Sequence, residues 1–221
     1  MAGFQISATL AEWPLFLQGA VVTLLVSLLG GLFGIVFGVG LTVMRAAPWA
    51  PLRWLAKTYM SFIRGTPILV QIFLVYYGLP GLTGIDLPPL VAGVLALSLN
   101  SAAFITEIIR AGLSAVPAGQ YEAAKALAVP RGIMWMRVIL PQVLRLTIPP
   151  LMNEFTMLVK ASPLLSVITV VELTRTAQNV MNFTYQPIQA FALAAVLYFV
   201  MLFSLSMLTR RVDARMRAVR A

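Results

Sequence analysis

The sequence contains no cysteine and no histidine, and only 10 % of its 221 residues are charged. Without cysteine the chain can form no disulfide and offers no thiol nucleophile. Without histidine it lacks the imidazole base and the ligand that most zinc and haem sites use. These absences argue against a membrane enzyme. A soluble domain usually has about a quarter of its residues charged, so the composition predicts an integral membrane protein.

Long uncharged runs set the expected number of membrane crossings. Four runs can each cover the roughly 20 residues that a helix needs to cross about 30 Å of hydrocarbon. A fifth run is interrupted by Glu154 and Lys160. We therefore expect an all-α integral membrane protein with five transmembrane helices in a single transmembrane domain, residues 1–221. The expected spans are 15–44, 58–79, 88–112, 146–170 and 187–209.

Basic residues indicate how the chain is oriented. A net charge of +9 could suggest nucleic acid, but the basic residues cluster after the first, third and last spans, which the positive-inside rule places in the cytoplasm. The opposite segments hold one basic residue, Arg175. We therefore expect an outside N-terminus, a cytoplasmic C-terminus and no nucleic-acid partner. We also expect the first apolar run to stay in the protein, because no basic stretch precedes it.

Glycines and prolines mark two local features. Gly30, Gly34 and Gly38 recur every four residues, a spacing that lets a second helix approach closely in lipid. The ordinary glycine content of membrane helices explains them equally well. The stretch 64–71, RGTPILVQ, predicts a broken or kinked entry to the second span, with Arg64 snorkelling to the inner boundary.

The segment 113–145 is the longest polar stretch between spans. Its part 118–128 is rich in helix formers, and Pro130 should end that helix near residue 129. A second short helix can then run from 131 to 141. Such a pair could dock its small alanine side chains into a partner, or rest passively on lipid headgroups. The residues alone leave both possibilities open.

Polar side chains inside the expected spans are candidates for a solute path, because ionisable groups in hydrocarbon are costly unless they face a cavity or a partner. On a helix, Asn100, Phe104 and Glu107 share one face. Glu107 could instead only pair with Arg110 three residues on. The candidate path residues are Asn100, Ser101, Phe104, Glu107, Asn153, Glu154 and Ser162.

The stretch EAAKALAVPRGIMWMRVILP resembles the EAA motif of permease subunits of ATP-binding-cassette importers. That motif has EAA, a glycine four residues later, and an I-x-L-P pattern about ten residues further on. Ala128 stands at the usual glycine position, and Pro130 is unexpected there. Further blocks, among them YMSFIRGTPILVQIFLVYYGLP and LMNEFTMLVKASPLLSVITVVELTRTAQ, resemble the polar amino acid branch, the histidine/glutamine type, over roughly 18–205.

The resemblance implies the type I ABC importer (MetI-like) permease fold, in which the EAA loop, 113–145, forms cytoplasmic coupling helices that dock on an ATPase. It implies coupling roles for Glu122, Ala123, Ala124, Ala128, Leu140 and Pro141. The implied partners are an ATP-binding subunit dimer, a second permease subunit of the same or a similar chain, an extracytoplasmic amino acid-binding protein and the lipid of a bacterial inner membrane.

Nucleotide chemistry is expected in a partner. The sequence has no G-x-x-x-x-G-K-[ST] pattern, the loop that cradles nucleotide phosphates. We therefore expect no enzyme activity, metal or cofactor in this chain, with ATP and Mg bound by the partner ATPase. The alternative is an autonomous secondary transporter or channel for small polar solutes, for which an internal repeat and more spans would be expected. The residues leave open which amino acid is carried, and whether the permease pair is a homodimer or a heterodimer.

Overall fold

The computed structural model describes residue 9 and residues 11–218, and within these residues all regular structure is helical. In this part of the chain, four helical segments are long and apolar enough to cross a membrane. They are α2 (Trp13–Ala46), α6 (Pro89–Ser114), a continuous helical run over residues 131–168, and α11 (Pro187–Ala218). The predicted all-α membrane architecture is confirmed.

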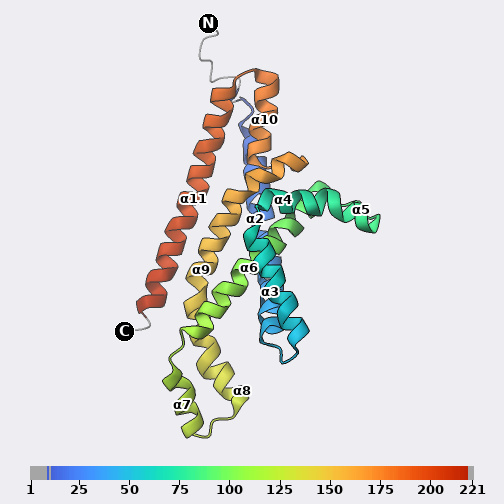
Figure 1. The fold of residues 1–221 in the computed structure, drawn as a ribbon. Coiled ribbons are helices and arrows are strands. Elements are labelled where there is room, and N and C mark those ends of the chain that lie inside the picture. The colour runs from blue at the N-terminus through green and yellow to red at the C-terminus, as the bar shows by residue number, and fades with distance from the viewer. Residues whose placement is uncertain (1–8, 10, 219–221) are drawn as a thin grey trace.

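The second expected span, 58–79, is bent. Helix α3 (Ala50–Gly65) and the segment that starts with α4 (Ile68–Phe73) meet at 115°. Thr66 is extended, with φ −121° and ψ 146°, the conformation favoured before a proline. The predicted break is therefore confirmed, and five crossings result only if the bent pair counts as one span. A π-helical turn, Leu74–Gly78, and α5 (Leu79–Thr83) continue the second half, which projects sideways from the bundle in Figure 1.

The expected pair of short helices in 113–145 is arranged differently. Helix α7 (Ala118–Ala126) ends three residues before residue 129. The second helix does not end at Pro141. Instead α8 (Arg131–Ile133) continues through a π-helical turn, Met134–Ile139, into α9 (Leu140–Ala161) and a 3₁₀ turn, Ser162–Ile168. Pro141 lies just after this π-helical turn, in which the Leu140 N–H bonds to the Trp135 oxygen five residues back, so the helix accommodates the proline where its hydrogen-bond register changes.

A further short helix, α10 (Leu173–Thr184), connects the fourth expected span to α11. Glu172 caps its N-terminus by accepting hydrogen bonds from the backbone N–H groups of Thr174, at 3.0 Å, and Arg175, at 2.7 Å. The hydroxyl of Tyr198 on α11 donates a third, at 2.7 Å. The side chain is completely buried, and this burial raises the pKa of the Glu172 carboxyl while the hydrogen bonds oppose the change.

Close packing of α2 on α6 forms the centre of the bundle. A Cβ placed on Gly30 would lie 3.0 Å from Leu97 Cβ, and one on Gly34 would lie 3.0 Å from Ser101 Cβ. The four-residue glycine spacing is therefore a helix contact, as the first of its two interpretations predicted. Leu97 of this contact also belongs to a buried apolar cluster with Val26, Leu158 and Leu165.

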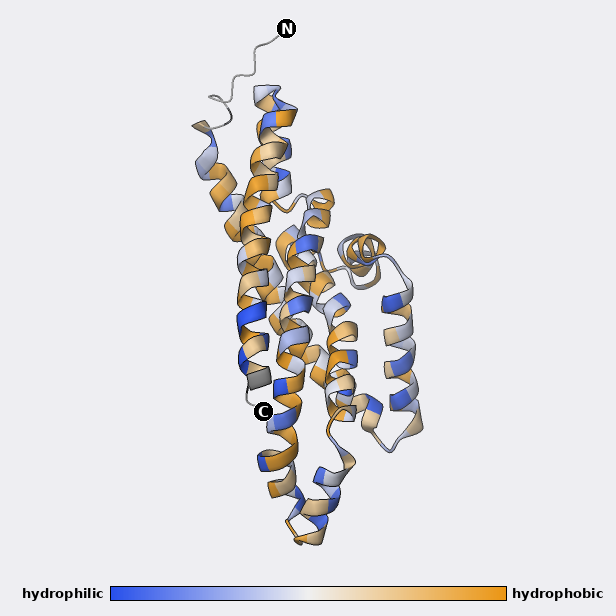
Figure 2. Cartoon of the chain, turned by 90° about the vertical axis from the view of Figure 1, so that its left-hand side faces the viewer, coloured by the Kyte–Doolittle hydropathy of each residue, from blue (hydrophilic) through white to orange (hydrophobic). Residues whose placement is uncertain are grey.

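The long helices give the molecule two ends of different character. Figure 1 shows α10 and the start of α11 at one end, and α7 and α8 at the other. In Figure 2 hydrophobic residues cover most of the long helices, whereas hydrophilic residues gather near the C-terminal end of α11 and around α7 and α8. The basic segment 113–145 and Arg210, Arg211 and Arg215 of α11 thus lie toward the same half of the molecule.

Two glycines of α2 allow a matched test of the α2–α6 contact. A Cβ on Gly38 would lie 2.9 Å from Ile105 Cγ2 and 3.1 Å from the Ala102 carbonyl oxygen, whereas one on Gly40 has no neighbour within 4 Å. We expect Gly38→Ala to lower the free energy of unfolding by about 1–3 kcal/mol through overpacking. Gly40→Ala should raise it by about 0.5–1 kcal/mol through helix propensity. Thermal unfolding in detergent measures both, and equal effects would contradict this packing.

Candidate functional site

Two neighbouring cavities lie beside α6. The first, the bend cavity, has about 370 Å³ and is lined by Arg64 and Thr66 at the α3–α4 break, by Asn100 and Phe104 of α6, and by Glu154 of α9. The second, the end cavity, has about 550 Å³ and lies toward the C-terminal half of α6. It is lined among others by Phe104, Glu107, Arg110, Leu146, Pro150 and Glu154. The two cavities share Phe104 and Glu154 in their walls.

The expected polar stripe on α6 lines both cavities. Asn100 and Phe104 face the bend cavity, and Phe104 and Glu107 face the end cavity. Glu154 reaches the same cavities from α9. The fold therefore brings together four of the predicted path residues in the walls of these two cavities: Asn100, Phe104, Glu107 and Glu154.

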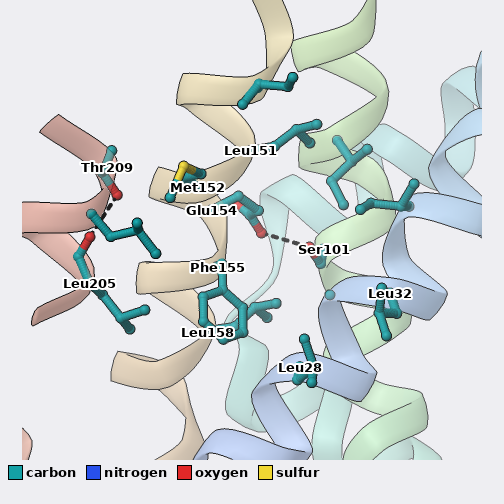
Figure 3. Close-up of a pocket in the computed structure, with 15 residues that line it drawn as sticks. Leu28, Leu32, Ser101, Leu151, Met152, Glu154, Phe155, Leu158, Leu205 and Thr209 are labelled. Carbon is teal, nitrogen blue, oxygen red and sulfur yellow. Dashed lines mark hydrogen bonds between the residues drawn. The ribbon is translucent and has the colours of Figure 1, made fainter. Parts of the chain in front are cut away.

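Ser101 holds Glu154 in this position. Its hydroxyl donates a 2.8 Å hydrogen bond to Glu154 Oε1, the dashed line between α6 and α9 in Figure 3. The pair lies at the wall of a further cavity of about 290 Å³ that is otherwise mostly apolar, with Leu28, Phe155 and Leu158 around it and Thr209 as a further polar residue. Ser101 does not line the bend cavity, so it acts there through Glu154.

Gln71 on α4 connects Asn100 to the helix break. Asn100 Nδ2 donates to Gln71 Oε1 at 2.8 Å, and Gln71 Nε2 donates to the carbonyl oxygens of Ile63, at 2.8 Å, and Thr66, at 3.1 Å. Sequence reasoning did not single out Gln71. The available signal was a lone amide four residues after Pro67, within an otherwise apolar run.

Glu107 forms ion pairs with three arginines, which come from three helices. Its carboxylate lies 2.6 Å from Arg45 Nη1 at the end of α2, 2.6 Å from Arg110 Nε, and 3.6 Å from Arg64 Nη1 at the end of α3. The alternative interpretation, an anchoring pair with Arg110, therefore describes part of a larger cluster. Three guanidinium groups against one carboxylate leave two positive charges in excess beside the end cavity.

Two predicted path residues lie elsewhere. Asn153 lines a separate polar cavity of about 590 Å³ between α9 and α11, together with Arg210 and Asp213. Ser162 is completely buried at the start of the 3₁₀ turn, and its hydroxyl donates to the Val159 carbonyl oxygen at 3.0 Å. Neither residue lines the bend cavity or the end cavity.

The segment 118–139, here called the inner hairpin, has its own apolar core. Ala124 is buried in it with Met134 and Ile139, against Val116 and Val143. Ala124 therefore stabilises the hairpin and offers no surface. Glu122, Ala123, Ala128 and Leu140 are exposed, Pro141 is half-buried, and Leu127, which sequence reasoning did not select, is 78 % exposed at the tip.

Ala128 forms the turn of the hairpin in a left-handed conformation, with φ +51°. Its N–H donates to the Lys125 carbonyl oxygen at 2.9 Å, and the N–H of Val129 donates to that of Ala124 at 3.0 Å. Glycine adopts this backbone without steric cost. Ala128 stands where the EAA motif usually has glycine, and its backbone conformation is one that favours glycine.

Comparison with known proteins gives consistent results along the chain. The family model described as "Binding-protein-dependent transport system inner membrane component" matches residues 30–218. The arginine transport system permease protein ArtQ of Bacillus subtilis is 36 % identical over 212 residues, which cover 96 % of this chain and 97 % of ArtQ. A crystal structure of an amino acid ABC transporter with histidines is 37 % identical, with a TM-score of 0.88 over 94 % of this chain and 96 % of its own.

A second solved structure is similar in fold alone. An inward-facing structure of the MetNI methionine ABC transporter is 19 % identical and has a TM-score of 0.71. The match covers 91 % of this chain and 98 % of the transporter chain.

The left-handed turn predicts opposite effects of one substitution at two positions of the inner hairpin. Ala128→Gly should stabilise the inner hairpin by about 0.5–1 kcal/mol, because it removes the cost of a side chain at positive φ. Ala123→Gly, inside α7, should destabilise it by about the same amount. Hydrogen exchange of the hairpin amides measures both, and destabilisation by Ala128→Gly would contradict the turn geometry.

Proposed function

This chain belongs to the family of binding-protein-dependent transport system inner membrane components, and from this we propose that it is the membrane-spanning subunit of an ATP-driven amino acid importer. The predicted type I, MetI-like permease fold is confirmed by the likeness to both transporter structures. The observation that carries the proposal is the match to an arginine permease over nearly the full length of both chains.

The proposed substrate path runs through the bend cavity and the end cavity. Polar groups between membrane-spanning helices usually mark the path of a transported solute. Glu154 and Asn100 supply polar contacts and Phe104 an aromatic wall, which suits an amino acid that carries an ammonium group. Ser101 positions Glu154. We place Asn153 and Ser162 outside this path, because they line neither cavity.

The substrate class we propose is a polar amino acid. Support comes from the names of similar proteins, one an arginine permease and one a transporter crystallised with histidines. An extracytoplasmic binding protein would deliver the amino acid and set much of the choice among substrates.

The inner hairpin is the proposed coupling element. It is a packed unit with its own core that projects beyond the end of α11 in Figure 1, which favours docking over passive contact with headgroups. Its exposed Glu122, Ala123, Leu127 and Ala128 are the proposed docking residues on the ATP-binding subunit. When ATP closes the two ATP-binding subunits, the hairpins move with them and switch the path between its two openings.

The membrane orientation follows from the same arrangement. We propose that the hairpin end of the molecule faces the cytoplasm of a bacterial cell, because Arg210, Arg211 and Arg215 at the end of α11 lie in the same half. The α10 end would then face the binding protein. A second permease subunit completes the pathway, and ATP and Mg bind to the partner ATPase.

Co-expression with the chromosomal neighbours of this chain tests the proposal. The chain should co-purify in mild detergent with an ATP-binding subunit, and proteoliposomes of this complex with the binding protein should take up an amino acid only with ATP inside. If the chain purifies alone and moves solute without ATP, it is the autonomous carrier of the alternative hypothesis.

The path assignment predicts the behaviour of Glu154→Gln, which removes the charge and keeps an acceptor for Ser101. We expect uptake to fall by about tenfold, corresponding to roughly 1.4 kcal/mol of lost binding, while the ATP-binding subunit stays bound. Glu12→Gln, a matched change just before α2, should leave uptake unchanged. Uptake by Glu154→Gln at the level of the unaltered chain would exclude the carboxylate from the path.

The coupling assignment predicts that Glu122→Lys uncouples the importer. ATP hydrolysis should persist while uptake falls several-fold, because the exposed side chain changes charge at the docking surface without disturbing the hairpin core. The control Asp86→Lys makes the same charge reversal in the loop before α6, away from the hairpin. Uptake and hydrolysis are measured on the same proteoliposomes, and coupled uptake by Glu122→Lys would refute the docking role.

A further inference from the structure

The break between α3 and α4 leaves a carbonyl group without its helical donor. In a continuous helix the Ile63 oxygen would accept from the N–H four residues later, but that residue is Pro67, which has none. Gln71 supplies the missing donor, since its Nε2 lies 2.8 Å from the Ile63 oxygen and 3.1 Å from the Thr66 oxygen. Gln71 is 4 % exposed, so water does not compete for these bonds.

These bonds determine which way the Gln71 amide points. Backbone carbonyl oxygens only accept hydrogen bonds, so the amide nitrogen must face them and the amide oxygen must face the other way. The group opposite that oxygen is the Asn100 amide, at 2.8 Å. Because Gln71 Oε1 can only accept, Asn100 must turn its NH₂ group toward Gln71 and its Oδ1 away from it.

Asn100 Oδ1 then opens to the bend cavity. Among the described residues, no group donates a hydrogen bond to this oxygen, and no side-chain oxygen without a partner is sealed from solvent. Since Asn100 lines the bend cavity, its oxygen is accessible there.

The Glu154 carboxylate on α9 adds further hydrogen-bond acceptors to the bend cavity. One of its oxygens accepts from Ser101, and in the described part of the chain no protein group occupies the other. The cation that lines this cavity, Arg64, is held toward Glu107. The polar atoms that Asn100 and Glu154 offer to a ligand are therefore acceptors.

We propose that Gln71 is a positioning residue that sets the hydrogen-bonding polarity of the bend cavity, so that the cavity takes a cationic N–H donor group, an ammonium or guanidinium group, of the substrate. The proline that bends the helix and the amide that faces the ligand are thus linked by two hydrogen bonds through Gln71. The inference rests on the proposed function, because it assumes that the bend cavity holds the transported amino acid.

The test is L-arginine binding to the purified complex with its ATP-binding subunit, measured by calorimetry without the binding protein. Asn100→Leu removes the cavity oxygen, and Gln71→Met keeps the length of the side chain but removes the amide that orients Asn100. We expect each variant to bind L-arginine about tenfold more weakly than the unaltered complex, the loss of one buried hydrogen bond. Because Gln71 acts through Asn100, the double variant should bind no more weakly than Asn100→Leu.

Two controls make this result specific. Gln18→Met makes the same substitution at an exposed position on α2, and Asn182→Leu does so at an exposed position on α10. Both should bind L-arginine as the unaltered complex does, and every variant should still assemble with the ATP-binding subunit.

The outcomes separate the inference from the proposed function. If Gln71→Met binds L-arginine as the unaltered complex does, or if the losses of the two single variants add in the double variant, Gln71 does not act through the Asn100 amide and the inference is wrong. ATP-dependent uptake of an amino acid without any L-arginine binding would support the importer and overturn the preference for a cationic group.

Discussion

In a bilayer no water is available to backbone groups, so each N–H and C=O must find its partner within the protein. Pro67 has no N–H to donate to the Ile63 carbonyl oxygen, and the local structure supplies another donor. The helix bends by 115°, and a side-chain amide from the next turn takes the place of the missing N–H. The bend cavity lies against this break, lined by residues from both of its sides.

The bend cavity forms because α6 and α9 are held close to the break between α3 and α4. Small residues on α2 let α6 pack at near backbone distance, with Gly34 against Ser101. Ser101 in turn reaches across to Glu154 on α9. Glu107 ties the ends of α2 and α3 to α6 through Arg45 and Arg64. The glycine contacts, the Ser101 hydroxyl and the Glu107 carboxylate thus place α3, α6 and α9 around the same cavities.

Much of this architecture was predictable from patterns that extend over many residues. Uncharged runs predicted a helical membrane protein, the EAA block predicted a permease fold, and the proline in 64–71 predicted the break. Residue spacing on one helix also placed Asn100, Phe104 and Glu107 on a common face. The hairpin was predicted less well. Its first helix is shorter than expected, and the second continues through Pro141 into α9, because a π-helical turn just before the proline changes the hydrogen-bond register there.

The sequence by itself determined the membrane class, the family and the periodic helix faces, because hydrophobicity, charge bias and helical spacing are local properties. Tertiary structure alone decided which polar groups meet. Gln71 with Asn100 and Ser101 with Glu154 are 29 and 53 positions apart, and Asn153 faces a different cavity from its neighbour Glu154. Such pairings depend on how helices from distant parts of the chain rotate and pack, which the helical period within one segment does not specify.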